Sequence, residues 1–409
     1  MTMSRMVPVA AALVLACLVS CRKEVVVEKV DPLVAAIEAQ RGVKALKRCS
    51  TFSSGYQATG MGVNKRFKIQ KAKFFHQVGT SRLEHVIAYG DLVVLVGGPD
   101  RCWRKQGQVV IPCDSVQREH ATRLGRLLEA SWLWPLKERK EYQVKPETRQ
   151  HDGKTYDGLS VSFGGQVMGT LLIDPKTSLV MGLTTRTTLL GKTGELVVMF
   201  TRLEKVKGIQ IATKREYSFA GEPYLTEELI GVMCEKPDQK RIDRPAQVES
   251  GHVQLKHKGS SSLACAKIKG PLSGIDAALE KVRGYLAKVE LPPVGPPFLV
   301  HHRAPPQVKR PAGYVTGVCL PVGREAWVKP KSLWKGEFYL YDDEGDEVLA
   351  AFGTGGPAKA TAELPGLLRK GAKERGRKRN KESLIQILHM YRPDIPAGEQ
   401  VSEMHAVLN

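Results

Sequence analysis

Residues 180–203 read VMGLTTRTTLLGKTGELVVMFTRL, and this stretch decides the fold expected for the first half of the chain. Two runs rich in β-branched and apolar residues, 180–190 and 196–203, flank the short segment Gly191-Lys192-Thr193-Gly194. Such runs favour strands, and a short glycine-containing connection joins antiparallel neighbours. The stretch therefore predicts a β-hairpin.

The same pattern recurs on both sides of this hairpin. Further strand-like runs, separated by Asp-Gly, Gly-Gly and Asp-Pro turns, are residues 66–77, 83–89, 92–96, 158–163, 169–173 and 209–218. Many antiparallel strands with few helices predict a curved sheet. Two helical stretches accompany the strands: one amphipathic helix at 31–48, capped by Asp31, and a second at 115–136. We therefore expect an α+β fold.

The first residues have the composition of an export signal. Arg5 precedes an apolar run at 7–19, which is too short to span a bilayer comfortably. Residues 18–21, Leu-Val-Ser-Cys, resemble the lipobox of bacterial lipoproteins. The resemblance implies removal of a signal peptide, residues 1–20, and acylation of Cys21 by a fatty acid such as palmitate, which anchors the protein to a membrane. An ordinary signal peptide and a retained transmembrane helix are the alternatives.

The residues after Cys21 bear on the location of the protein. In the lipoprotein family, an acidic pair at this place retains the protein at the inner membrane, whereas this chain has Arg22 and Lys23. The resemblance therefore implies a cell-envelope protein that is lipid-anchored in the outer membrane and faces the periplasm.

If the chain is exported, its net charge limits the classes of partner that it can bind. The 62 Lys and Arg residues exceed the 42 Asp and Glu residues by 20, an excess that would otherwise suggest nucleic-acid binding. Outside the cytoplasm the available anionic partners are lipid head groups and cell-wall polymers, so we expect no nucleic-acid partner. The most basic stretch, residues 369–382, is interpreted either as a solvated face or as a contact with such a surface.

Six of the eight cysteines remain when Cys17 and Cys21 are set aside, and an even number suits an oxidising compartment. The best pair is Cys102 with Cys113, because the residues between them read as a hairpin turning at Gln106-Gly107. The sequence leaves the connectivity of the other four open, and the simplest arrangement has one bridge per half, Cys49 with Cys234 and Cys265 with Cys319. Zinc would need further ligands at short spacing, so no metal is expected.

Three segments of the first half carry a family resemblance. Residues 172–177 (LIDPKT), 191–195 (GKTGE) and 200–209 (FTRLEKVKGI) resemble the periplasmic lipoprotein-carrier family over about residues 28–234. The resemblance implies an unclosed antiparallel barrel that wraps over helices and shelters acyl chains, and one relative in that family receives other lipoproteins. An apolar ligand or a role in lipoprotein trafficking follows from it. The alternative is that the apolar face is only the core of this domain.

Residues 236–252 mark a boundary, because they contain two prolines and almost no apolar side chains. We expect a half-barrel domain at 21–235, this linker, and a second domain at 253–409. The second domain contains an internal repeat at a constant offset of 86 residues. The matched segments are 270–271 with 356–357, 298–302 with 384–388, and 315–321 with 401–407. Each copy predicts the order strand, helix, strand, strand.

The second domain resembles the gyrase-inhibitor-like effector-binding domain. The segments that carry the likeness are 269–271 (KGP), 295–302 (GPPFLVHH), 353–357 (GTGGP), 390–393 (MYRP) and 402–404 (SEM). The resemblance implies a groove between the two repeats that binds small cationic or aromatic molecules. Glu403 matches the carboxylate that the family places in this groove, and Tyr391 matches the family tyrosine.

These residues lead to a ligand-binding hypothesis. A buried carboxylate beside aromatic faces attracts a cation both by charge and through the ring quadrupole. Besides Glu403 and Tyr391, the candidate ligand-binding residues are Tyr339, Tyr341 and Trp327, each of which could instead belong to the core. The alternative for Glu403 itself is an exposed position on a strand edge.

Some members of the effector-binding family are hydrolases, so catalysis centred on Glu403 is a second hypothesis. No second acid, nucleophile or metal cluster stands at a convincing spacing, which favours a small-molecule binding protein that is not an enzyme and needs no cofactor. His301 and His302 are adjacent, and neighbours on a strand point to opposite faces, which argues against a shared metal.

Overall fold

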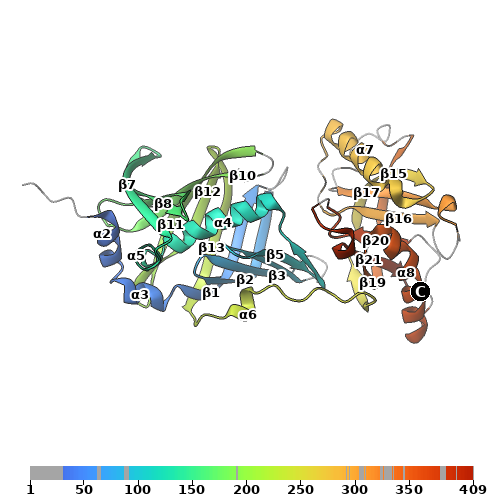
Figure 1. Cartoon of the computed structure of the whole chain (residues 1–409), viewed down its shortest axis with the longest axis horizontal. Coiled ribbons are helices and arrows are strands. Elements are labelled where there is room, and N and C mark those ends of the chain that lie inside the picture. The colour runs from blue at the N-terminus through green and yellow to red at the C-terminus, as the bar shows by residue number, and fades with distance from the viewer. Residues whose placement is uncertain are drawn as a thin grey trace, which may run out of the picture.

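The computed structural model describes two antiparallel sheets with helices, which confirms the α+β class. The described residues are 31–61, 66–86, 92–189, 192–291, 293, 295–303, 308, 310–322, 326, 334, 336–343, 346–377, 384–392 and 394–408. Cys21 and Trp327 lie outside them. Figure 1 shows each sheet with its own helices, and an extended segment that leads from one to the other.

The first sheet has thirteen strands, and neighbours in it are antiparallel. In spatial order they are β6 (Val109–Pro112), β5 (Cys102–Gln106), β4 (Leu92–Gly97), β3 (Thr80–Val86), β2 (Arg66–Gln77), β1 (Thr51–Met61), β13 (Glu222–Cys234), β12 (Ile209–Phe219), β11 (Lys192–Val206), β10 (Val180–Leu189), β9 (Gln166–Ile173), β8 (Lys154–Phe163) and β7 (Tyr142–His151). Strands β6 and β7 end the order without pairing to each other, so the sheet is unclosed, as predicted. The hairpin predicted at 180–203 is β10 with β11.

The helices of the first half are α2 (Pro32–Ala39), α3 (Val43–Arg48), α4 (Ser115–Ala130) and α5 (Trp134–Glu138). Asp31 caps α2 as predicted, because its carboxylate accepts from the backbone N–H of Leu33. The prediction of a single helix over 31–48 is wrong: Arg41 and Gly42 have positive φ angles of 63° and 83°, which end one helix before the next begins. Leu133, at φ 61°, likewise separates α4 from α5.

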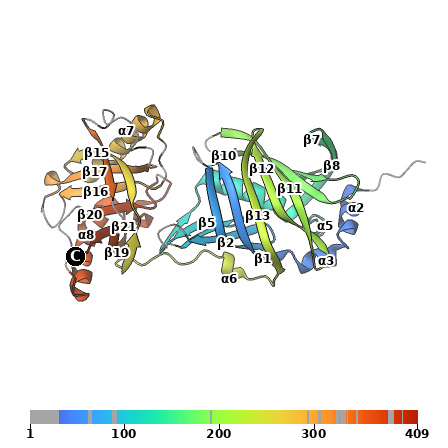
Figure 2. The ribbon, with the colours of Figure 1, turned by 180° about the vertical axis from the view of Figure 1, so that it is seen from behind.

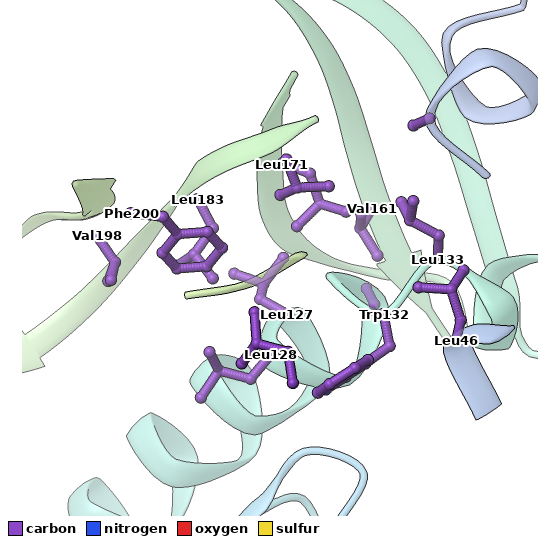
Figure 3. Close-up of a cluster of buried hydrophobic side chains, with 14 of the residues drawn as sticks. Leu46, Leu127, Leu128, Trp132, Leu133, Val161, Leu171, Leu183, Val198 and Phe200 are labelled. Carbon is purple, nitrogen blue, oxygen red and sulfur yellow. The ribbon is translucent and has the colours of Figure 1, made fainter. Parts of the chain in front are cut away.

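Helix α4 lies across one face of the first sheet (Figure 1), and the view from behind shows the strands in front of it (Figure 2). A capping box between Asp114 and Gln117 begins this helix. Its buried Leu127 points into the space between helix and sheet, toward Leu171 and Leu183 (Figure 3). The apolar face of the first sheet is therefore covered by the chain itself.

The second sheet has eight antiparallel strands. In spatial order they are β14 (Val253–Lys258), β19 (Asp346–Thr354), β21 (Val401–Val407), β20 (Leu384–Leu388), β16 (Phe298–Arg303), β17 (Val315–Val322), β15 (Ser261–Lys269) and β18 (Phe338–Asp343). Helices α7 (Ile275–Lys288) and α8 (Pro357–Glu374) pack on one face, where they bury Leu279 and Leu364. We call the opposite side the helix-free face.

One order of elements occurs twice in the second half. Strand, helix, strand, strand occurs as β15, α7, β16, β17 and again as β19, α8, β20, β21. Strand β18 lies between the two series, and β14 precedes both.

Short 3₁₀ turns lie at Leu272–Gly274, Pro311–Gly313 and Ala397–Glu399. The segment 236–252 carries a small helix, α6 (Gln239–Ile242), whose Ile242 packs beneath the first sheet.

Three disulfides join the described cysteines. Cys102 pairs with Cys113, as predicted, and the two pairs that the sequence left open are Cys49–Cys234 and Cys265–Cys319. Disulfides are typical of proteins outside the cytoplasm, so the chain has the character of an extracytoplasmic protein. Among the residues that the structure describes, none of the helices has the length and apolar composition needed to cross a membrane.

Candidate functional site

Glu403 lies on β21, between β19 and β20, and only 3% of the residue is exposed. It does not occupy an exposed strand edge. Its neighbour Met404 points the other way and packs against α8. Because alternate residues of a strand face opposite sides, the carboxylate of Glu403 belongs to the helix-free face.

Three side chains contact this carboxylate. Lys256 Nζ lies 2.9 Å from Oε1, His405 Nε2 lies 2.6 Å from Oε1, and His389 Nε2 lies 2.8 Å from Oε2. We call Glu403, Lys256, His389 and His405 the Glu403 cluster. Lys256 lies on β14, Glu403 and His405 lie on β21, and His389 follows the end of β20.

The protonation states follow from these contacts. Burial alone would raise the pKa of the Glu403 carboxyl, but the charge of His405 and hydrogen bonds from both imidazoles hold it well below its usual range. Burial lowers the pKa of His405 despite the nearby carboxylate. We therefore describe Glu403 as ionised, with Lys256 as its charged partner and both imidazoles as hydrogen-bond donors to it.

Each imidazole of the cluster has one nitrogen without a hydrogen bond to any described residue. The Nδ1 atoms of His389 and His405 are buried and have no hydrogen-bond partner within the described part of the chain. Buried polar atoms normally find a partner in protein, water or ligand. The Glu403 cluster thus has polar capacity that the surrounding described residues do not satisfy.

A second buried ion pair lies on the same face. Lys258 on β14 pairs with Asp343 on β18, and both side chains are less than one-tenth exposed. Strands β14 and β18 stand at opposite ends of the strand order, so the sheet must curl to bring these two residues together. Burial raises the pKa of Asp343, and Lys258 opposes that shift. The helix-free face is therefore concave and contains two lysine–carboxylate pairs.

The predicted aromatic residues Tyr339 and Tyr341 lie on β18, and alternation places them on the same face as Asp343. The Tyr339 hydroxyl lies 2.9 Å from His302 Nε2, and burial raises the pKa of Tyr339 to about 12. Lys267 Nζ lies 5.7 Å from the centre of the Tyr339 ring. Both tyrosines border a buried apolar group on this face, formed by Leu263, Cys265, Phe298, Val300, Cys319, Ile385 and Ile387.

The structure does not bring Tyr391 to Glu403. The Tyr391 hydroxyl donates to Asp276 Oδ1 at 2.7 Å, and its ring packs against the core beneath α7. There it lines a separate cavity of about 370 Å³ together with Arg283 and Arg392. The chain turns at the end of β20 in such a way that His389, two residues earlier, reaches the carboxylate instead.

Sequence reasoning missed Lys256, His389 and His405. His405 could have been found, because it stands two residues after Glu403 on the same strand and therefore on the same face. Lys256 is 147 residues away from Glu403, and no local pattern connects them. His301 and His302 do point to opposite faces, since His301 bonds Gln386 and His302 bonds Tyr339. Within the described ranges, no group of three or more potential ligands is arranged to hold a metal.

The cavity beside α4 in the first half is small. The cavity between α4 and the strands measures about 50 Å³ and is lined by His76, Trp132, Phe200 and Arg215, among others. Arg215 is buried, and its Nη1 lies 3.8 Å from Glu227 Oε2. A cavity of this size holds a few water molecules, whereas an acyl chain would need α4 to move.

Comparison with known proteins gives only distant structural similarities. No family model matches the chain, and no curated protein matches it. A hydrolase from Listeria innocua is similar over 39% of this chain and 93% of its own, at 11% identity and a TM-score of 0.30. A DUF1329 family protein from Desulfovibrio piger is similar over 52% of this chain and 100% of its own, at 12% identity and a TM-score of 0.33.

A third solved structure, of a protein bound to tetraphenylphosphonium, covers 39% of this chain and 94% of its own at 10% identity and a TM-score of 0.26. At these values the similarities carry no function over. We therefore base the proposed function on the residues of this chain.

Proposed function

We propose that this chain is a lipid-anchored protein of the cell envelope that binds a small cationic or amphipathic aromatic molecule on the helix-free face of its second sheet. The observation that carries the proposal is the buried carboxylate of Glu403, whose charged partner is the ammonium of Lys256. Burying an ion pair costs desolvation energy that well-packed apolar residues would avoid. The Nδ1 atoms of His389 and His405, which have no partner among the described residues, leave hydrogen-bonding capacity for a ligand.

The chemistry of the face suits an organic cation. The ligand's charge would take the place of the Lys256 ammonium next to Glu403, while its apolar part would pack against Tyr339, Tyr341 and the buried aliphatic side chains between them. Lys267 already lies over the Tyr339 ring, so this ring accepts a cation within the protein. Aromatic and aliphatic surface with a few polar groups is typical of ligand sites.

Calorimetric titration with tetraphenylphosphonium and benzyltrimethylammonium tests this proposal. Glu403→Gln keeps the shape of the side chain and removes its charge, so we expect affinity to fall at least tenfold. Glu347→Gln is the matched control, because Glu347 lies on the neighbouring strand β19 and pairs with Arg377 at the surface. Equal binding by both variants and the unmodified chain would refute the role of Glu403. Tyr341→Leu provides a second test if Glu403→Gln is unstable.

A hydrolase remains the second candidate because two imidazoles are oriented by the Glu403 carboxylate. In carboxylate–histidine pairs the carboxylate fixes the ring, and the other nitrogen serves as general base. Here that atom would be Nδ1 of His389 or His405, neither of which has a hydrogen-bond partner among the residues that the structure describes. Turnover of an ester panel that disappears in His389→Gln or His405→Gln would support this function, whereas binding without product favours the first.

The membrane anchor is a separate part of the proposal. Labelling cells with an alkyne analogue of palmitate should tag the unmodified protein and Cys17→Ser, which keeps the acceptor, but not Cys21→Ser. Fractionation of the envelope then reports whether the protein is in the outer membrane. Tagging of Cys21→Ser would contradict the lipobox interpretation.

A further inference from the structure

The hairpin of β5 and β6 belongs to the first half and packs against the second half. Strand β6 is the edge of the first sheet, and the Cys102–Cys113 disulfide braces the hairpin at its base. Val110 lies on the face of the sheet that packs against Ile242, in a cluster with Val94 and Trp103. The alternate residues Val109 and Ile111 are buried in a different cluster, whose other members come from the second half: Ala350, Phe352, Met390, Ile395 and Val401.

This contact lies directly beside the Glu403 cluster. Phe352 is the register partner of Glu403 in the pairing of β19 with β21. Val401 is two residues before Glu403 on β21 and therefore faces the same side. The apolar side of the hairpin thus rests on both neighbours of the carboxylate.

The turn of the hairpin reaches the charged partner of Glu403 in the same way. Gln108 Nε2 donates to Gln254 Oε1 at 3.4 Å, and Gln254 is two residues before Lys256 on β14. Gln254 and Lys256 share one face of that strand. The hairpin therefore contacts residues that flank Glu403 and a residue that flanks Lys256.

The segment between the halves holds the hairpin at its outer edge. Gln247 Oε1 accepts from the Val110 backbone N–H at 3.0 Å, and Gln247 Nε2 donates to the Val110 carbonyl at 2.7 Å. One side-chain amide thus satisfies both backbone groups that an edge strand would leave open. The same Nε2 lies 3.3 Å from Met390 Sδ in the second half.

One feature opposes this docking. Arg104 is the register partner of Ile111, so it lies on the side of the hairpin that faces the second half. Although Arg104 is exposed, partial desolvation and the positive charge of Arg392 lower its pKa. Two apolar side chains and a few hydrogen bonds hold the hairpin against this repulsion, so the contact is suited to opening.

We propose that the β5–β6 hairpin is the lid of the Glu403 site, and that the site exchanges ligand when the hairpin lifts from Phe352 and Val401. The first half of the chain thereby controls access to a site in the second half. The identity of the ligand rests on the proposed function, whereas the lid contact stands on the packing alone.

The experiment locks and releases the lid in the full mature chain. Gln108→Cys with Gln254→Cys, oxidised and verified by peptide mapping, should slow the association of tetraphenylphosphonium at least tenfold relative to Gln108→Cys alone. Val109→Ser with Ile111→Ser should speed association severalfold, and should speed cleavage after Glu249 by endoproteinase Glu-C at least fivefold. Val116→Ser is the control, because Val116 is exposed just beyond the hairpin.

Equal association rates in the locked and unlocked chains would overturn the lid. If the unmodified chain binds none of the cations, the proposed function is wrong, and cleavage after Glu249 still tests the contact: faster cleavage of the released variant supports docking, and unchanged cleavage overturns it. The locked variant remains informative if the serine pair prevents folding.

Discussion

The two sheets differ in what covers their concave faces. The first sheet has α4 on its apolar face, where Leu127 and its neighbours form a buried cluster (Figure 3). A cavity of about 50 Å³ lies beside Leu128 and Trp132. The helix-free face of the second sheet instead holds Glu403, Lys256 and two histidines, all buried or nearly so. The first sheet also holds a largely buried ion pair, Arg215 with Glu227, so buried charge alone does not distinguish the two faces. What distinguishes the second face is a buried carboxylate that contacts a lysine and two imidazoles. This difference places the candidate site in the second half.

The largest effect is expected from leaving the buried carboxylate unpaired. Lys256→Met removes the ammonium while Glu403 stays buried, so the second half should lose about 3–5 kcal/mol of unfolding free energy. The double variant Lys256→Met with Glu403→Gln should recover most of that loss, because no charge is then stranded. Denaturant titrations of the single and double variants measure both quantities. Additive losses would show that the two residues do not form a pair.

The same single variant sharpens the ligand hypothesis. In Lys256→Met the carboxylate has lost its internal cation, so an organic cation should stabilise this variant more than the unmodified chain. Thermal shifts measured over a concentration series of benzyltrimethylammonium provide the comparison. A smaller shift in the variant would contradict competition between ligand and Lys256.

The core of the first half should respond to loss of volume. Leu127 is fully buried on α4, and Leu127→Ala should destabilise the first half by about 2–5 kcal/mol through lost burial and a residual cavity. Val116→Ala, at an exposed position of the same helix, should change stability by less than about 0.5 kcal/mol. Differential scanning calorimetry distinguishes the two. If Leu127→Ala instead bound acyl chains without loss of stability, the first face would be a ligand site after all.

Acid should weaken the first half through His76. Burial and the charge of Arg215 lower the pKa of His76 to about 3, and its Nε2 accepts from Trp132 Nε1. Below pH 6.5 His76 binds a proton in the unfolded chain but not in the folded chain, so the free energy of unfolding falls as the pH falls. Between pH 7 and pH 5 the expected loss is roughly 1–2 kcal/mol. Urea unfolding of His76→Gln should show a flatter pH dependence, and an unchanged slope would assign the effect elsewhere.

Local patterns in the sequence predicted individual strands and turns. Contacts between residues far apart in the chain could not be predicted in this way. Alternating apolar runs marked β2 and β10, and the turn at Gly107 marked the Cys102–Cys113 hairpin. Strand β1 was missed because Ser53, Ser54 and Gly55 dilute its pattern, although Phe52 and Tyr56 are buried. Glu403 emerged from a family resemblance, whereas its partner Lys256 becomes apparent only when the edge strand β14 is placed in the sheet.

The smallest effect on stability, and a clear one on binding, is expected from the end of α8. Its described basic residues past Leu368 are exposed: Arg369, Lys370, Lys373, Arg375 and Arg377. We propose that they contact anionic lipid or cell-wall polymer, because basic side chains each add about 1 kcal/mol of attraction to such a surface. Replacing Arg369, Lys370 and Lys373 by glutamine should leave unfolding within about 0.5 kcal/mol and reduce sedimentation of the delipidated chain with vesicles of one-third anionic lipid. A matched triple replacement of Lys145, Lys154 and Lys176 in the first half carries the same change in net charge. If both variants lose vesicle binding equally, net charge rather than the α8 surface is responsible.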